Sequence, residues 1–241
     1  MMRIFTNKFS GFTLIEMAIV LVIIGFILGG LLVSLTAQTD LRNYAETRKT
    51  LEDSKEALVG FTLNNRHLPC PDKTTGANNG INDNPNDGIE DFNAATGNCV
   101  VVEGNLPWST LSLTNTDAWG QAFIYRVSTA FSQRSPLNTF NLTMNGNIRV
   151  CNEAACSTPP LTSNAIAVVI SRGKNRSICS TLPSLPACAD ERANDDNNND
   201  FVSHEPRVRT LANPNGEYDD FVVWLSSSIL MNRMVAAGQL P

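Results

Sequence analysis

The sequence predicts an α+β fold in which a long N-terminal helix packs on an antiparallel β-sheet head. Proline is absent between Phe12 and Leu68, so one helix of roughly 50 residues can run through this stretch without a break. Short runs of apolar and β-branched residues follow in the second half of the chain, separated by turn-forming residues. Together these patterns predict a helix layered on a sheet.

The first half of the predicted helix is apolar enough to cross a membrane. The stretch 17–39 holds 23 residues without a charged side chain. As a helix it would be roughly 35 Å long, which exceeds the bilayer hydrocarbon core of about 30 Å. Arg3 and Lys8 precede this stretch, and positively charged flanks remain in the cytoplasm. We therefore expect a basic leader (1–11), a membrane-spanning half-helix (12–39) and a head outside the cytoplasm.

The second half of the helix, residues 40–66, is amphipathic. Its apolar side chains recur at steps of three, four and seven residues, which is the spacing of a helix face that packs against a core. They are Leu41, Tyr44, Leu51, Leu58 and Phe61. Pro69 and Pro71 end the helix, because proline lacks the backbone donor and clashes with the preceding turn.

Residues 67–241 form the predicted globular head. Its first part, residues 72–98, is rich in Asn, Asp and Gly and is expected to be a loop. Strand patterns follow, and the two that flank Asn145-Gly146 predict a hairpin with a tight turn. The predicted strands cover residues 122–127, 139–144, 147–151, 165–171 and 221–225, and residues 226–237 are expected to close the chain as a short helix.

All six cysteines follow the predicted membrane segment, so they are expected outside the cytoplasm, where disulfides persist. Six cysteines allow fifteen pairings, and proximity in the sequence favours the pairing of neighbours. The expected disulfides are Cys70–Cys99, Cys151–Cys156 and Cys179–Cys188. A zinc site would draw on His67 and Cys70, but the sequence contains no Cys-x-x-Cys pair.

Composition and motif content argue against two classes of function. The chain carries 18 Lys and Arg against 23 Asp and Glu, and two of the basic residues belong to the leader. A head with this acidic balance lacks the basic face that nucleic-acid binding requires. The sequence also contains no Gly-x-Ser-x-Gly elbow, no phosphate-binding glycine loop and no His-Glu-x-x-His. We therefore expect no catalytic residues and no enzyme activity.

One carboxylate, Glu16, stands at the beginning of the apolar helix. A charge on a membrane helix is costly, by about 2.5–3.5 kcal/mol near the bilayer centre, and by default it indicates function. If the chain were cut after Gly11, the new amine of Phe12 would lie one helical turn before Glu16 and could pair with it.

The residues around this carboxylate are Gly11-Phe12-Thr13-Leu14-Ile15-Glu16, with a basic leader before them and an apolar helix behind. This junction resembles the processing signal of the type IV pilin and type II secretion pseudopilin superfamily. The resemblance implies that a prepilin peptidase cuts after Gly11 and methylates the amine of Phe12. It also implies that Glu16 serves in assembly when subunits join a fibre. The alternative is an ordinary signal anchor with a stray glutamate.

The resemblance implies a structural subunit, a minor pilin or pseudopilin of a type IV pilus or type II secretion pseudopilus. It would be a single-pass protein of the bacterial inner membrane with its head in the periplasm, and later part of the fibre. The expected partners are the prepilin peptidase, other pilin or pseudopilin subunits, the inner-membrane assembly platform and membrane lipid. The alternative is a fibre-tip binding module, either an adhesin or a minor pilin that contacts a substrate or DNA. The acidic balance argues against nucleic acid.

Short motifs in the head are similar to those of the major type II secretion pseudopilins. They are Asp117-Ala118-Trp119-Gly120 with Phe123 and Tyr125, Ser171-Arg172-Gly173-Lys174-Asn175, and Asp219-Asp220-Phe221 with Trp224. In that family the loop between the last two segments holds a structural calcium. Asn175 stands where the family has aspartate and Arg176 where it has glycine, whereas Asp220 matches. The loop between them is longer than is usual in the family.

Calcium is therefore the candidate cofactor, and two clusters of Asp and Asn offer the oxygen ligands that it prefers. The candidate ligands are Asp83, Asp87 and Asp91 in the first cluster, and Asp195, Asp196 and Asp200 in the second, which Asp219 or Asp220 would complete. The segment 83–88 resembles the spacing of a calcium-binding loop, although Pro85 occupies its third position and the terminal glutamate is missing. The alternative is a solvated loop, because Asn, Asp and Gly are also the residues that turns use.

Overall fold

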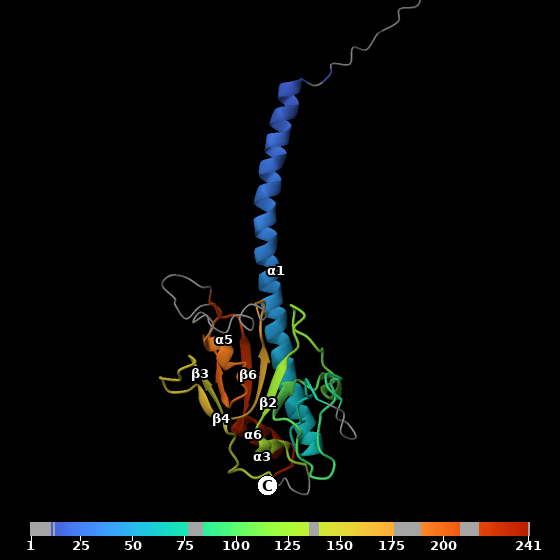
Figure 1. Cartoon of the computed structure of the whole chain (residues 1–241), viewed down its shortest axis with the longest axis vertical. Helices are drawn as coiled ribbons and strands as arrows, with labels where there is room; N and C mark the ends of the chain where they lie inside the picture. The colour runs from blue at the N-terminus through green and yellow to red at the C-terminus, as the bar shows by residue number, and fades with distance from the viewer. Residues whose placement is uncertain are drawn as a thin grey trace, which may run out of the picture. The chain divides into compact units, whose positions relative to one another are not determined.

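The structure is a computed structural model that describes residues 11, 13–76, 84–134, 140–175, 189–207 and 217–240, without the side chains of residues 27–37. The chain separates into two compact units, residues 1–44 and 45–241. Helix α1 (Leu14–Asn65) begins in the first unit and ends in the second. The predicted long N-terminal helix is thus confirmed (Figure 1).

In the first unit, helix α1 carries an exposed apolar surface. Leu14 is 90 % exposed and Phe26 is 80 % exposed, and most side chains between them are large and apolar. Among the residues whose side chains are described, no helix combines the length and the hydropathy that a membrane crossing requires.

In the second unit, the C-terminal part of α1 buries one face. Leu51 and Leu58, two of the predicted apolar positions, are fully buried, and Thr62 is buried one turn further on. The helix ends at Asn65, because Arg66 adopts a left-handed φ of 61° and its N–H donates to the carbonyl of Thr62 at 2.8 Å. Leu51 and Leu58 therefore lie on the packed face that the amphipathic pattern predicts, whereas Leu41, in the first unit, is 68 % exposed.

The described residues of the head form a six-stranded sheet (Figure 1). Its strands are β1 (Glu103–Asn105), β2 (Ile124–Val127), β3 (Ile148–Cys151), β4 (Thr162–Ser171), β5 (Asp200–Val202) and β6 (Phe221–Ser226). The strand order is β1-β2-β4-β3-β5, and β6 pairs with β4 outside this path. The pair β3–β5 is parallel and the other described pairs are antiparallel, so the predicted antiparallel sheet is confirmed except for this pair.

Strand β4 is the centre of the sheet, because it pairs along both edges. Val169 lies opposite Tyr125 of β2 and opposite Val223 of β6. Residues 165–171 of β4 are all buried, as their nearly continuous apolar run predicts. Side chains from β2, β3, β5 and β6 complete the core around this strand, among them Ile124, Ile148, Val150, Phe201 and Val222.

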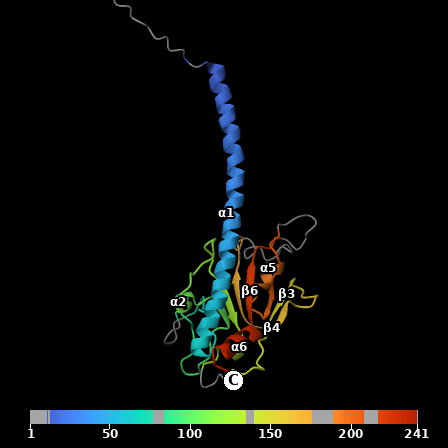
Figure 2. The ribbon, with the colours of Figure 1, turned by 180° about the vertical axis from the view of Figure 1, so that it is seen from behind.

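Short helices accompany the sheet in the described residues. They are α2 (Trp108–Leu111), α3 (Thr129–Ser132), α5 (Ala189–Ala193) and α6 (Ser227–Ala236). Helix α6 follows β6 directly and corresponds to the predicted closing helix. Arg233 of α6 lies 3.5 Å from Glu56 of α1, and Figures 1 and 2 show the two helices side by side from opposite directions.

The predicted hairpin across Asn145-Gly146 is wrong in its first strand. The described residues 140–144 form no strand, because the side-chain oxygen of Asn141 accepts the backbone N–H of Thr143 at 3.0 Å and closes a turn there. Strand β3 pairs with β4 and β5. Gly146 passes directly over β4, where a Cβ would lie 1.9 Å from the carbonyl oxygen of Ala165.

Two disulfides join cysteines that are close in the sequence. Cys70 pairs with Cys99 and Cys151 pairs with Cys156, with Cα atoms 5.2 Å and 5.4 Å apart. The first bond links the two ends of the loop expected over residues 72–98. The third expected pair, Cys179 and Cys188, lies outside the described residues.

Candidate functional site

Two residues of the predicted processing motif, Thr13 and Glu16, form reciprocal hydrogen bonds at the start of helix α1. Oε2 of Glu16 accepts the backbone N–H and the hydroxyl of Thr13, both at 2.8 Å. The Thr13 hydroxyl oxygen in turn accepts the backbone N–H of Glu16 at 3.3 Å. This arrangement is a capping box, for which the Thr-x-x-Glu spacing is the sequence signal. The expected partner of Glu16, the amine of Phe12, lies outside the described residues.

Within the described residues, the head contains one group of acidic side chains close enough to hold a metal ion together. Glu191 of α5 and the consecutive residues Asp219 and Asp220 each place a carboxylate oxygen within 4.8 Å of the others. All three side chains are buried, with exposed fractions of 4–5 %. Burial of so many carboxylates calls for compensation, because a low-dielectric interior penalises charge.

Backbone N–H groups and one side-chain amide hold two of these carboxylates in place. Oδ2 of Asp219 accepts the N–H of Lys174 at 2.9 Å and that of Asn175 at 3.1 Å. Oε1 of Glu191 accepts the N–H of Asp219 at 2.9 Å and the amide of Asn175 at 3.2 Å. The cluster therefore joins the end of β4, helix α5 and the start of β6.

The head motifs bring the end of β4 against the start of β6. Ser171 donates through Oγ to Oδ2 of Asp117 at 2.6 Å, and Oδ1 of Asp117 accepts two N–H groups of the turn that follows it. Gly173 has a φ of 58°, and a Cβ at this residue would lie 2.4 Å from the carbonyl oxygen of Asp219. Glycine is required here by both the backbone conformation and the close approach.

Three oxygens of the cluster are buried without a hydrogen-bond donor among the described residues. They are Oδ1 of Asn175, Oε2 of Glu191 and Oδ1 of Asp219. Nearly all buried polar atoms in proteins have a partner, so three unsatisfied oxygens at one place require an explanation. Amide and carboxylate oxygens are the ligands that calcium prefers, and it takes six to eight of them, water included. Together with the carboxylate of Asp220, these oxygens form a donor set that fits calcium better than zinc, because zinc favours nitrogen and sulfur ligands.

The electrostatics of the cluster also favour a cation. Burial raises the pKa of Glu191 to about 7 and that of Asp219 to about 6, and neighbouring carboxylates add to both shifts. Burial likewise raises the pKa of Asp220 well above its ordinary value. A divalent cation would stabilise the charged form of all three groups, whereas burial without a cation favours their protonated, neutral form.

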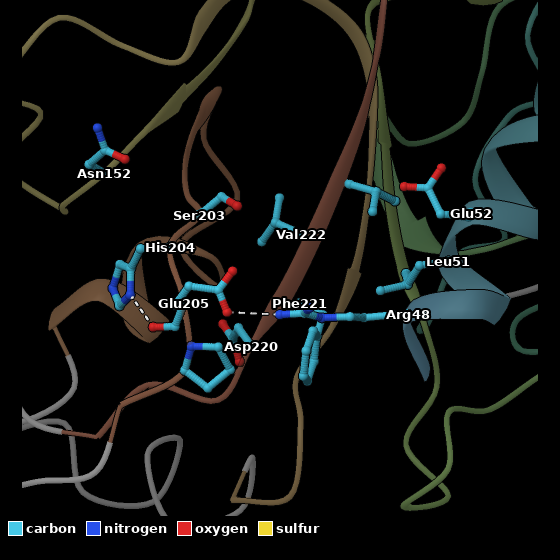
Figure 3. A pocket seen from close by; sticks show the side chains of 12 residues that line it. Arg48, Leu51, Glu52, Asn152, Ser203, His204, Glu205, Asp220, Phe221 and Val222 are labelled. Atoms are coloured by element: carbon cyan, nitrogen blue, oxygen red, sulfur yellow. Dashed lines mark hydrogen bonds and ion pairs between the residues drawn. The ribbon is translucent and has the colours of Figure 1, made fainter. Parts of the chain in front are cut away.

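A groove of about 540 Å³ borders the cluster on the side of Asp220, which lines it (Figure 3). The groove lies between α1, β6 and the segment that follows β5. Arg48 of α1 donates across it to Glu205 at 2.9 Å, and its guanidinium lies 5.6 Å from the ring centre of Phe221. Of the three acidic residues of the cluster, only Asp220 lines this groove.

The predicted ligands between residues 195 and 200 do not join the cluster. Two of these acids form ion pairs with arginines, Asp195 with Arg172 and Asp200 with Arg149. Asp196 accepts the N–H of Asn198 at 3.2 Å within a turn. Of this predicted set, only Asp219 and Asp220 belong to the buried group.

The other predicted set, in the loop after the first disulfide cysteine, stabilises backbone turns. Oδ1 of Asp87 accepts the N–H of Ile89 at 2.9 Å, and Oδ2 of Asp91 accepts the N–H of Lys73 at 2.7 Å. Asp83 lies outside the described residues. In the part of the chain that the structure describes, these carboxylates do not lie close enough to one another to hold a metal ion.

Glu191 is the member of the cluster that sequence analysis missed. It lies in a helix of five residues, Ala189–Ala193, between two other charged side chains. No motif spacing connects it to Asp219 or Asp220, so the sequence offers no signal for its place in the cluster.

A comparison with known protein families concerns the N-terminal motif. Residues 6–32 match the family described as the prokaryotic N-terminal methylation motif. Neither the curated proteins nor the solved structures give a significant match to the chain. The chain thus carries, at its N-terminus, the signature of the precursors of type IV pilins and pseudopilins.

Proposed function

We propose that this chain is a minor pilin or pseudopilin, a structural subunit that is cut after Gly11, methylated at Phe12 and assembled into a fibre through helix α1. The match of residues 6–32 to the methylation motif carries this proposal. The exposed apolar side chains from Leu14 to Phe26 support it, because lipid or neighbouring helices have to cover such a surface.

In this proposal, residues 17–39 lie in the inner membrane before assembly and the head lies in the periplasm. Arg3 and Lys8 favour a cytoplasmic position for the leader. The two disulfides of the head suit an oxidising compartment. The partners would be the prepilin peptidase, the assembly platform and other pilin or pseudopilin subunits.

The mass of the mature N-terminus tests the processing step. The chain is produced in cells with an active prepilin peptidase and, as a control, in cells with an inactive one. We expect a chain that begins with methylated Phe12 in the first case and an intact leader in the second. A chain that retains residues 1–11 beside the active peptidase would contradict the proposal.

The roles of Glu16 in capping and in assembly can be separated by two replacements. Glu16→Gln keeps an oxygen acceptor for Thr13 and removes only the charge, whereas Glu16→Ala removes both. We expect both variants in the membrane fraction and neither in sheared fibres, because the charge has to pair with the amine of Phe12. Glu46→Gln removes a carboxylate from the same helix outside the motif and should enter fibres normally. If Glu16→Gln enters fibres at the wild-type level, the charge is not required.

A role at the fibre tip is the alternative form of this proposal. Labelling with an antibody against the head distinguishes the two, since a tip protein is labelled only at fibre ends. Labels along the shaft would instead indicate a repeated building block.

We further propose that Asn175, Glu191, Asp219 and Asp220 form a structural calcium site of the head. The three buried oxygens without donors support this, and bound calcium would supply them with positive charge. Calorimetric titration of the full chain in detergent should show calcium binding that Asp219→Asn removes. Failure of millimolar calcium to bind the wild-type chain would refute the site.

A further inference from the structure

The groove beside Asp220 follows the backbone edge of strand β6. It is lined by four consecutive residues around the start of β6, 220–223, and by the four consecutive residues after β5, 203–206 (Figure 3). Side chains of a strand alternate between its two faces, so a groove that contacts successive residues of β6 runs along the edge of this strand.

The two stretches that line the groove are paired at one end. Arg207 and Tyr218 form an antiparallel bridge, in which each backbone N–H donates to the other residue's carbonyl oxygen, at 2.9 Å and 3.0 Å. A ladder that continued from this bridge would place Ser203 opposite Val222. Within the described residues, no backbone hydrogen bond joins Ser203 to Val222, and the groove lies between them. The two stretches therefore diverge from the bridge and leave a gap in the place of a continued ladder.

Strand β6 has a second edge next to this gap. Among the described strands it pairs with β4 alone, through one of its two edges. Strand β5 differs, because the side chain of Asn194 accepts the N–H of Val202 at 2.8 Å and donates to its carbonyl oxygen at 3.2 Å. A strand edge without a neighbouring strand presents backbone N–H and C=O groups with which an added strand can pair.

The side chains around the gap indicate the chemistry of a partner. Leu51 of α1 and Phe221 of β6 give it apolar walls. Glu52 and Glu205 add carboxylates whose side chains are 58 % and 86 % exposed. Arg48 donates to Glu205 at 2.9 Å, but an exposed ion pair contributes little stability, so a basic side chain of a partner can replace Arg48. Apolar and basic side chains together fit this lining.

We propose that an extended segment of another polypeptide binds in this gap and adds a strand to the second edge of β6. Backbone hydrogen bonds would give affinity, and alternating apolar and basic residues would give specificity. The segment would lack proline, because proline has no N–H to donate to the ladder. The head would thus dock a partner protein at a place separate from the exposed apolar surface of α1.

Fluorescence anisotropy with the full chain in nonionic detergent tests this inference. The probe is a labelled hexapeptide in which valine alternates with lysine, and micelles without protein are the blank. We expect saturable binding, and N-methylation of the peptide backbone should weaken it about tenfold or more, because the methyl groups remove the donors of the ladder. Bound peptide should also slow hydrogen–deuterium exchange of amides in residues 220–225.

Three variants test whether the peptide binds at the groove. Glu205→Lys reverses a charge of the lining and should weaken binding of the peptide about fivefold or more. Asp53→Lys makes the same change at an exposed residue of α1 outside the lining and should bind as the wild type. Arg48→Gln removes the internal competitor for Glu205 and should strengthen binding about threefold.

Four outcomes would overturn the inference. No binding at millimolar peptide would exclude the site, and equal binding of the N-methylated peptide would exclude strand addition. Equal losses in Glu205→Lys and Asp53→Lys would place the peptide away from the groove. Dimers of the wild-type chain that Glu205→Lys abolishes would assign the gap to a second copy of this chain instead of another polypeptide.

Discussion

The backbone N–H of Asp219 donates to Oε1 of Glu191 at 2.9 Å, so two buried carboxyl groups lie against each other in the interior of the head. The other oxygens of the pair, Oε2 of Glu191 and Oδ1 of Asp219, have no hydrogen-bond donor in the described part of the chain. Such a pair can be neutralised by a proton or by a metal cation, and the two compete for the same oxygens. The pH dependence of stability therefore reports which of them is bound.

Without calcium, we expect the head to lose stability as the pH rises through about 6 and about 7, the raised pKa values of Asp219 and Glu191. A carboxyl group whose pKa is higher in the folded state stabilises the fold while it is protonated, and this contribution disappears on ionisation. Calcium binds the ionised form, so the difference in Tm between calcium and EGTA should grow over the same pH range. Thermal unfolding of the full chain in detergent measures both curves. A Tm in EGTA that rises or stays constant through this range would contradict the expectation.

Asn175→Asp should strengthen calcium binding and weaken the calcium-free head. The replacement adds a fourth carboxylate and removes the amide that donates to Glu191, so repulsion increases when no cation is present. Calcium affinity rises with the number of charged ligands, and we expect a gain of about tenfold. Asn198→Asp is the control, since it adds the same charge to an exposed turn outside the cluster. A loss of affinity in Asn175→Asp would exclude Asn175 from the ligands.

Gly173→Ala should disrupt the cluster, and Gly120→Ala is its matched control. Both glycines have positive φ, 58° and 78°, so both replacements strain the backbone by about 1 kcal/mol. Only at Gly173 would the new Cβ meet other atoms, 2.4 Å from the carbonyl oxygen and 2.5 Å from Oδ1 of Asp219. We expect Gly173→Ala to lower Tm further than Gly120→Ala and to abolish calcium binding. Equal effects of the two replacements would show that Asp219 can move without loss.

The elements that the sequence predicts well are those whose pattern is local. The proline-free stretch of α1, the apolar run of β4 and the apolar strand β6 followed by α6 each carry their own signal. Strand β5 has only three residues and pairs in parallel with β3, so no turn or alternation identifies it. The hairpin prediction failed because Asn-Gly favours a tight turn in isolation, whereas Asn141 closes a different turn nearby.

The candidate metal ligands show the same limit. Runs of acidic residues in a sequence suggest metal ligands. Asp195 and Asp200, however, form ion pairs with arginines that come from other parts of the chain. Glu191 gives no such signal, and only the fold brings it to Asp219. The spacing of residues in a sequence identifies a site when its residues lie on one element, whereas the residues of this cluster come from three separate segments.

A buried ion pair in β1 and β2 provides a prediction independent of the metal site. Arg126 donates to Glu103 at 2.9 Å, with side-chain exposures of 9 % and 11 %, and it also binds Asn199. Arg126→Met would leave Glu103 buried without its cation, which costs about 3–5 kcal/mol and lowers Tm by about 10 °C or more. Because burial raises the pKa of Glu103, the loss should shrink at low pH, where Glu103 binds a proton.

Two further variants test whether the burial of Arg126 and Glu103 causes the predicted loss of stability. Arg126→Met combined with Glu103→Leu removes both charges and should recover much of the lost stability. Asp200→Asn breaks the exposed pair with Arg149, whose side chains are 42 % and 44 % exposed, and should cost less than about 1 kcal/mol. If Arg126→Met lowered Tm no more than Asp200→Asn does, then water would reach Glu103 readily enough to replace its partner, and the pair would not be buried in solution.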